Sequence, residues 1–224
     1  MICGVNQIDP NTIYRELQYN SLVTLGNYYG LDIYFDWQRI NEQIKPFVND
    51  WKQYNPRKSH IPRFGLSLTS LDGGLSGEPD LGSIVEYNHE HSTTFGEESF
   101  TTETRVLKTS PALRKPLEPF LPYLGRSHLI CLNEGGHFPF HRDSQIFGAS
   151  TFRLISLLNN CDSNAFCFLY NDQRIVLNQN QLYFMNTKVC HALFSFSDDA
   201  TLLILNVIVS EESTNCVRKY LTAK

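Results

Sequence analysis

Apolar residues in the C-terminal half of the chain occur in short runs that polar turns separate. Between residues 127 and 209 these runs are SHLICLNE, TFRLISLL, AFCFLYN, QRIVLN, QLYFMN, HALFSF and TLLILNVIV. Runs of this length, joined by Asn, Asp, Gly and Ser, are typical of the strands of a β-sandwich or barrel. No segment between the runs is long enough for a crossover helix, which excludes a parallel α/β sheet.

The first third of the chain has apolar residues at helical spacing instead. Asp36 precedes the segment WQRINEQIKPFVNDWKQY as a candidate helix N-cap, and Pro46 lies inside it, where proline kinks or divides a helix. The apolar positions that recur along this segment are Trp37, Ile40, Ile44, Phe47, Val48 and Trp51. We therefore predict that residues 1–60 form a mostly helical flank, which packs these side chains on a sheet.

The pattern between residues 61 and 126 is mixed. RFGLSLTSL alternates apolar and polar positions as a half-buried strand does, and the turn-rich DGGLSGEPDLG follows it. We interpret EYNHEHSTTFGEESFTTET as a loop with a short strand. Beyond the core, EESTNCVRKYLTAK is expected to form a last short helix.

These patterns together predict one domain over residues 1–224. Its parts are the helical flank 1–60, a core over 61–210 and a C-terminal tail over 211–224. We expect an all-β core, a double-stranded β-helix or jelly roll of the cupin kind, because many short strands without crossover helices close as two packed sheets. A chain of 224 residues is long enough to bury one such core.

Composition and charge narrow the classes of function. The apolar fraction of 42% and the charged fraction of 19% are those of an ordinary globular protein. A formal net charge of -4 argues against nucleic acid or an anionic membrane surface as the main partner. The first residues do not resemble a signal peptide, and no apolar run is long enough to cross a bilayer. We therefore expect a soluble, intracellular, cytoplasmic protein.

The cysteines and the common catalytic motifs point to no other chemistry. The six cysteines are scattered without a CxxC pair, so we predict small, mostly buried side chains in a reducing compartment. The chain contains neither GxGxxG nor the P-loop motif, and it lacks the GxSxG motif of serine hydrolases.

The segment GGHFPFHRDSQ carries the chemistry that stands out most. It places His141 and Asp143 two residues apart, and side chains two apart on an extended chain point to the same side. His191 stands 50 residues later, at the start of another apolar run. Two imidazoles and one carboxylate can hold a metal on one face and leave other positions open. On residue types alone zinc is almost as good a candidate as iron. The alternative is that these side chains bind no metal and only form hydrogen bonds within the protein.

The same part of the chain resembles a known family. GRSHLICLNEGGHFPFHRD, TFRLISLL and NQLYFMNTKVCHALFSFSDDATLLILNV are similar in order and spacing to the aspartyl/asparaginyl β-hydroxylase family, which includes relatives that hydroxylate free proline. The resemblance covers about residues 125–209, a little under half of the chain. It implies an Fe(II)- and 2-oxoglutarate-dependent dioxygenase that uses O2 to hydroxylate an unactivated C–H bond. The implied substrate is an amino acid, free or within a peptide or protein.

Carried over residue by residue, the resemblance makes His141, Asp143 and His191 the iron ligands and the catalytic centre. Arg153, inside TFRLISLL, matches the strand arginine whose guanidinium grips the far carboxylate of 2-oxoglutarate. A structural ion pair between Arg153 and a protein carboxylate is the alternative, because an arginine in such an apolar strand needs an anionic partner either way.

One departure from the family bears on the co-substrate. Many members carry a second arginine on the last strand, where this chain has Thr201, and ATLLILNVIV contains no cation. Arg153 must then bind the co-substrate, with Thr201 and Asn206 as expected hydroxyl and amide helpers. On the substrate side, Arg126 and His128 are candidates for holding a carboxylate.

The remaining histidines rank lower as site residues. His137 is a candidate for lining the substrate pocket, whereas His89 and His91, a second pair two residues apart, are expected to be solvated. Two other functions stay open. A non-oxygenase cupin, an isomerase or a binding protein, would keep the metal but need no carboxylate clamp, and a structural or interaction protein would hold no metal.

Overall fold

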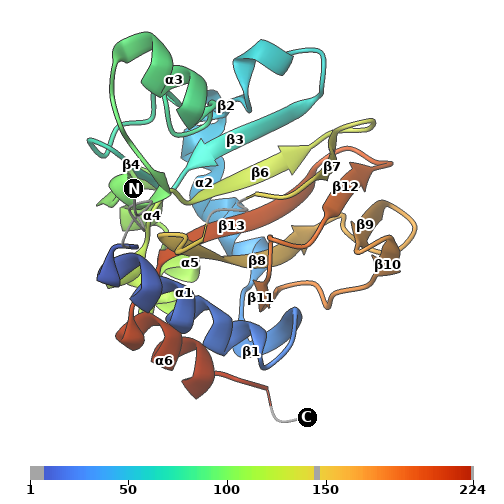
Figure 1. The fold of residues 1–224 in the computed structure, drawn as a ribbon. Coiled ribbons are helices and arrows are strands. Elements are labelled where there is room, and N and C mark those ends of the chain that lie inside the picture. The colour runs from blue at the N-terminus through green and yellow to red at the C-terminus, as the bar shows by residue number, and fades with distance from the viewer. Residues whose placement is uncertain (1–7, 144–146, 223–224) are drawn as a thin grey trace.

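Two antiparallel β-sheets lie face to face in the centre of the molecule (Figure 1). The structure is a computed structural model, and it describes residues 8–143 and 147–222. The larger sheet has the strand order β1-β11-β8-β13-β6-β3-β2, and the smaller sheet has the order β10-β9-β12-β7. The predicted all-β jelly roll is therefore the fold of this chain.

All seven apolar runs of the C-terminal half are strands, as predicted. The strands of the larger sheet are β1 (Tyr28–Tyr34), β2 (Lys52–Gln53), β3 (Arg63–Ser67), β6 (His128–Leu132), β8 (Thr151–Asn159), β11 (Gln181–Met185) and β13 (Ala200–Ile208). Those of the smaller sheet are β7 (His137–His141), β9 (Phe166–Tyr170), β10 (Gln173–Ile175) and β12 (His191–Ser195). A separate short ladder joins β4 (Thr69–Ser70) and β5 (Thr102–Glu103).

The central strand β13 explains why the larger sheet has two apolar faces. Leu202 and Ile204 point toward the smaller sheet and belong to the core between the sheets. Leu203 and Leu205 point the other way and pack with the helices. Because a strand alternates its side chains, burial on both faces requires an unbroken apolar run, and ATLLILNVI provides one.

Helices cover the outer face of the larger sheet (Figure 1). α1 (Pro10–Val23) and α6 (Glu211–Lys219) lie side by side there, and the hydroxyl of Thr214 donates to Gln18 Oε1 at 3.0 Å. The other helices are α2 (Trp37–Ile44), α3 (Ile84–His91), α4 (Arg105–Thr109), α5 (Pro111–Arg114) and the 3-10 turns η1 (Lys45–Asp50), η2 (Pro56–Lys58), η3 (Glu97–Ser99), η4 (Lys115–Leu117) and η5 (Leu121–Tyr123).

Three details of the helical predictions are confirmed. The side chain of Asp36 accepts a hydrogen bond from the backbone N–H of Arg39 at 3.2 Å and caps α2. The helix ends at Ile44, and a 3-10 turn that begins at Lys45 and contains Pro46 follows it, so the proline divides the predicted segment. The predicted last short helix is α6.

Three predictions of local structure were wrong or incomplete. The helical flank contains a strand, β1, whose alternating Leu31 and Ile33 are buried by pairing with β11. HFPFH forms β7, where Pro139 is tolerated because β7 is an edge strand. The region read as a loop contains α3, and Ser83 caps it by accepting from the backbone N–H of Glu86 at 3.4 Å.

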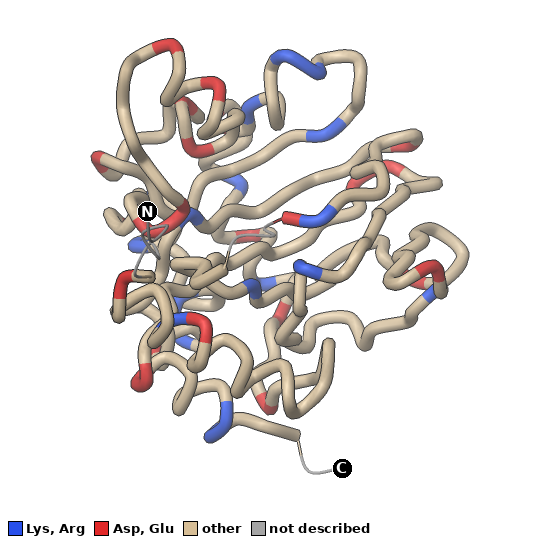
Figure 2. The backbone as a smooth tube through the Cα atoms, in the orientation of Figure 1, with Lys and Arg blue, Asp and Glu red and all other residues tan. Residues whose placement is uncertain are grey.

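The strands carry few charges. Acidic and basic positions are interspersed along the described backbone, most of them in helices and loops (Figure 2). Within the described ranges, no helix has both the length and the apolar character needed to span a bilayer. The five described cysteines are free thiols, of which Cys161 is buried and the others are half-buried, and Cys3 lies outside the described residues.

Candidate metal site

His141 and His191 face each other across two neighbouring strands. His141 ends β7 and His191 begins β12, and the antiparallel register pairs them directly. Their ring centroids lie 4.3 Å apart. Asp143 follows two residues after His141, and its backbone N–H donates to the carbonyl of Thr187 at 3.1 Å, which fixes the chain beyond the strand. The β7–β12 pairing thus unites residues that are distant in sequence.

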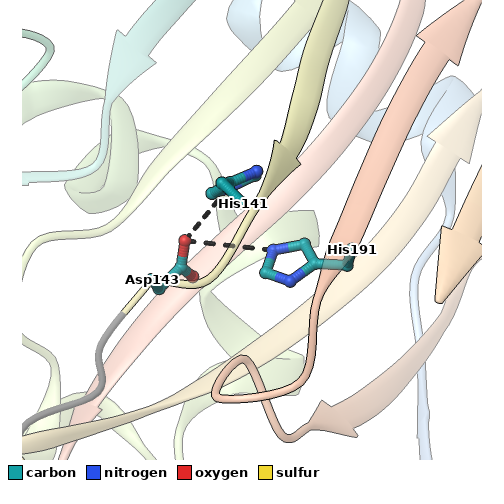
Figure 3. Close-up of side chains that lie close together, drawn as sticks. All are labelled: His141, Asp143 and His191. Carbon is teal, nitrogen blue, oxygen red and sulfur yellow. Dashed lines mark ion pairs between the residues drawn. The ribbon is translucent and has the colours of Figure 1, made fainter. Parts of the chain in front are cut away.

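The three side chains converge on one point (Figure 3). Asp143 Oδ1 lies 3.2 Å from His141 Nε2 and 3.9 Å from His191 Nε2. One potential ligand atom from each residue lies within 4.8 Å of the other two. The predicted grouping of two imidazoles and one carboxylate is therefore present in the folded chain.

The hydrogen bonds of the two imidazoles favour metal binding. His141 Nδ1 lies 2.7 Å from the carbonyl of Pro139, and His191 Nδ1 lies 2.9 Å from the carbonyl of Val189. A carbonyl only accepts, so Nδ1 carries the proton in each neutral ring and Nε2 keeps its lone pair. Both lone pairs belong to the atoms nearest Asp143, and the donor set of two nitrogens and one oxygen fits a divalent transition metal.

Burial and charge act against each other at these residues. Burial opposes ionisation of Asp143, but Arg153 and the two imidazoles outweigh it and hold the pKa of Asp143 below its ordinary value. Burial would also lower the pKa of His141, but the hydrogen bond to Asp143 outweighs it and raises that pKa. The pKa of His191 is lowered, because burial prevails there over the attraction of Asp143.

Arg153 contacts the other oxygen of Asp143. Arg153 Nη2 lies 3.0 Å from Asp143 Oδ2, and the arginine side chain is 18% exposed. Its Nε has no hydrogen-bond partner among the described residues. From the sequence, such an ion pair with a protein carboxylate was the alternative to a co-substrate contact for Arg153. The Nε group remains as a donor for another contact. A co-substrate role for Arg153 stays a prediction.

A cavity of about 340 Å³ opens beside the cluster, between the two sheets. Its polar wall includes His141, Asp143, Arg153 and His191. Most of the remaining wall is apolar, formed by Ile130, Phe138, Ile155, Phe168, Met185, Leu193, Leu202 and Ile204. An apolar cavity with a few converging polar groups is the usual form of a small-molecule site.

A second hollow lies on the far side of Asp143 and Arg153. Its volume is about 450 Å³, and it shares Asp143 and Arg153 with the first cavity. Its walls include the polar side chains of Asn88, Ser150 and Asn206. Asp143 of the candidate metal cluster therefore lies between two hollows.

Of the other predicted site residues, some line the cavity and some do not. Arg126 lines the cavity, and its Nε lies 2.9 Å from Glu97 Oε2. Asn206 donates through Nδ2 to the same Glu97 oxygen at 2.7 Å and to the carbonyl of Arg126 at 2.7 Å. Thr201 is not among the lining residues, and its hydroxyl donates to the carbonyl of Asp199 at 3.1 Å. Side chains alternate along β13, so Leu202 and Ile204 face the cavity and Thr201 does not.

The predicted histidines outside the cluster do not line the cavity. His128 is 1% exposed and lies beside the ring of Tyr54, with 5.4 Å between ring centroids. Burial and then Arg126 hold the pKa of His128 well below its ordinary value, so the ring is neutral. His137 stacks on Phe194 on the opposite face of its strand. The rest, His89 and His91, are exposed on α3, as expected, although a helix does not place residues two apart on one face.

Sequence reasoning missed Tyr54, Phe138 and Glu97 as residues of the cavity wall. Phe138 carried a usable signal, since it stands three residues before His141 in a segment already singled out. Tyr54 and Glu97 carried none, because they reach the cavity through a loop and a 3-10 turn whose positions depend on tertiary packing.

Comparison with solved structures finds two kinds of protein. An oxidoreductase of the 2OG-Fe(II) oxygenase family from Burkholderia pseudomallei is 10% identical, with a TM-score of 0.47 and coverage of 94% of each chain. The collagen prolyl hydroxylase of Paramecium bursaria Chlorella virus-1 is 8% identical, with a TM-score of 0.43 and coverage of 83% of this chain and 97% of that one. A predicted oxalate decarboxylase from Thermotoga maritima is 13% identical, with a TM-score of 0.31 and coverage of 41% and 73%.

No family model and no curated protein matches the chain. At these identities and TM-scores, the activities named for the solved proteins do not transfer to this chain. The resemblance to the aspartyl/asparaginyl β-hydroxylase family also stays a prediction.

Proposed function

We propose that this chain is an Fe(II)- and 2-oxoglutarate-dependent dioxygenase that hydroxylates an amino acid, free or within a peptide or protein. The observation that carries the proposal is the cluster of His141, Asp143 and His191 at the mouth of an apolar cavity inside a jelly roll. In the overall reaction one oxygen atom enters the substrate and the other enters succinate, while CO2 leaves the 2-oxo acid. The redox chemistry of that reaction belongs to the bound iron and the 2-oxo acid.

In this proposal the residues of the chain hold the metal, orient its ligands and exclude water from the cavity. His141 and His191 would hold the metal through Nε2 and Asp143 through Oδ1, and three protein ligands of this kind leave other coordination positions for small molecules. Arg153 keeps Asp143 Oδ2 occupied, so that Oδ1 stays directed at the imidazoles. The apolar walls keep bulk water from the reacting groups. The second hollow, which Asp143 and Arg153 also line, is the proposed place of the substrate.

The test is an anaerobic titration of the metal-free protein with Fe(II) and then with 2-oxoglutarate, followed by visible absorption. We expect a charge-transfer band that appears only with both components and is lost in His191→Ala. His89→Ala is the matched control, because His89 is exposed on α3, and it should keep the band. An unchanged band in His191→Ala would contradict the proposal.

A metal-binding cupin that is not an oxygenase is the second candidate. The observation in its favour is the cavity side of β13, where Leu202 and Ile204 stand and the last strand offers no cation. Under this function the protein would bind the metal, and 2-oxoglutarate would produce neither a band nor a change in metal affinity.

A further inference from the structure

Three polar side chains form a row across the larger sheet at the edge of the cavity. Asn206 of β13 is paired in register with Arg153 of β8. On its other side, the backbone N–H of Gly125 donates to the carbonyl of Asn206 at 2.7 Å, and Asn206 Nδ2 donates to the carbonyl of Arg126 at 2.7 Å. The Arg126–Asn206–Arg153 row therefore runs from the segment just before β6 across β13 to β8, with an arginine at each end.

Each arginine of the row is paired with one protein carboxylate. Arg153 Nη2 contacts Asp143 Oδ2 at 3.0 Å, and Arg126 Nε contacts Glu97 Oε2 at 2.9 Å. The side chain of Arg126 is 9% exposed, and one of its other nitrogens donates to the carbonyl of Gly82 at 3.1 Å. Both guanidinium groups line the same cavity as the candidate metal ligands.

The two ion pairs of the row carry no net charge while no metal is bound. Two guanidinium groups and the carboxylates of Asp143 and Glu97 cancel each other. A divalent metal on two neutral imidazoles and Asp143 adds two positive charges to a largely apolar cavity. Unpaired charge in such a place is costly, so a dianion fits the metal-loaded site and a monoanion leaves one charge uncompensated.

The spacing of the row suits a short dianion. Arg126 and Arg153 lie on the two sides of Asn206 in β13, and two spacings of neighbouring extended chains correspond to about 10 Å between backbones. The metal would bind at the Arg153 end of the row, because Asp143, one of the candidate metal ligands, forms an ion pair with Arg153. The wall beside the row is formed by Ile155 and Ile204, which suit a methylene chain between two charged ends.

Other cations near the cavity are less suited to hold the far end. Arg63 donates to the carbonyl of His137 at 2.9 Å and packs over the ring of Phe138, and it is not among the lining residues. Arg142 lines the mouth but is exposed, so water already solvates its charge. Arg126 is both buried and open to the cavity.

We infer that Arg126 is the anchor for the far carboxylate of a dicarboxylic 2-oxo acid, and that Arg153 positions Asp143. The inference rests on the proposed function and names the residue that makes the site prefer a dicarboxylate over a monocarboxylate. From the sequence, Arg153 was expected to bind the far carboxylate of the co-substrate and Arg126 a carboxylate of the substrate. Under this inference Arg126 binds the co-substrate carboxylate instead.

Two ligands that differ at one end test this assignment. The Mn(II)-loaded protein is titrated calorimetrically with 2-oxoglutarate and with 2-oxopentanoate, which carries a methyl group in place of the far carboxylate. A buried charge-assisted contact corresponds to a preference of about 10- to 100-fold for 2-oxoglutarate. Equal affinities in the wild-type protein would overturn the inference and leave Arg126 free to bind a substrate carboxylate.

The variant is Arg126→Met combined with Glu97→Gln, because removing the arginine alone would leave Glu97 without its partner. We expect it to bind both oxo acids as weakly as wild type binds 2-oxopentanoate, with Mn(II) affinity retained. The control is Arg114→Met with Glu103→Gln, an Arg–Glu pair at 3.2 Å whose residues do not line the cavity, and it should keep the preference.

Glu97→Gln alone gives a result that structural damage cannot imitate. It frees Arg126 from its internal carboxylate, so we expect tighter binding of 2-oxoglutarate and unchanged binding of 2-oxopentanoate. An undiminished preference in the double variant would overturn the role of Arg126 while the proposed function stands. Binding of Mn(II) with no binding of either oxo acid would instead overturn the proposed function, and the inference with it.

Discussion

The two carboxylate oxygens of Asp143 have different partners. Oδ1 faces both imidazoles, and Oδ2 faces the guanidinium of Arg153. A carboxylate held in this way has one oxygen for a metal and a fixed orientation before any metal arrives. Loss of such a second partner of a metal ligand typically costs about 10- to 100-fold in metal affinity.

Removing that second partner should weaken metal binding. We predict that Arg153→Met lowers the affinity for Mn(II) about 10- to 100-fold, because Asp143 loses its orienting contact. Arg153→Lys should restore part of the affinity, since one ammonium can still reach one oxygen. Titration with Mn(II) followed by electron paramagnetic resonance measures both, and full affinity in Arg153→Met would contradict the role.

Asp80 is a second buried carboxyl, and its effect on stability depends on pH. It is 1% exposed and accepts a hydrogen bond from the hydroxyl of Ser67. Burial raises its pKa, although Ser67 and Arg126 oppose that shift. When the pKa of a carboxyl group is higher in the folded than in the unfolded state, the free energy of unfolding falls as the pH rises from the lower of these two pKa values through the higher one.

We therefore predict that Asp80→Asn stabilises the protein at neutral pH and that the gain disappears at acid pH. Urea unfolding at several pH values measures the difference from wild type. Asp32→Asn, at an exposed position of β1, is the control and should show no such trend. A gain that persists below the ordinary carboxyl pKa would contradict the explanation.

At the scale of elements, the turn between β6 and β7 places His141. Gly135 has φ +80°, and a Cβ added there would meet nothing within 4 Å. A Cβ on Gly136 would lie 2.6 Å from the carbonyl oxygen of Pro62 and 2.8 Å from that of Asn133. Both contacts are with backbone atoms, so the chain entering β7 would have to move.

The two glycines should therefore differ in their effect on the metal site. Gly135→Ala is expected to cost roughly 1–2 kcal/mol of stability for the left-handed conformation and to keep metal affinity. Gly136→Ala should also lower the affinity for Mn(II), because it shifts the strand that carries His141. Urea unfolding and metal titration of both variants check this, and equal metal affinities would refute it.

At the scale of the whole molecule, metal binding should stabilise the fold. The ligands come from two strands of the smaller sheet and the segment after one of them, and Arg153 comes from the larger sheet. A ligand that binds only the folded state at 100 times its dissociation constant adds about 2.7 kcal/mol. For a chain of this size, that corresponds to a rise in Tm of roughly 5–11 °C.

Thermal unfolding with and without Mn(II) at that concentration measures the rise. His191→Ala should lose it, because it removes the most buried of the three ligands. An equal rise in this variant would mean that the metal stabilises the protein from another site.

The sequence by itself determined most of the strands and the pair of candidate metal ligands within one segment. Strand alternation and turn residues are local properties, so the seven C-terminal runs were predictable, and so was the common side of His141 and Asp143. Local signals also existed for β1, in the alternating Leu31 and Ile33, and for α3, in its Ser83 cap.

Only the tertiary structure decided which residues share the cavity. The ion pair of Arg153 with Asp143 and the Arg126–Asn206–Arg153 row depend on strand order and register, which connect segments up to 80 residues apart. For Thr201 the facing of β13 decided the outcome, because Leu202 and Ile204 line the cavity and their neighbours point the other way. Side chains on a strand change faces with each single-residue slip, so a correct spacing in sequence does not fix a position in space.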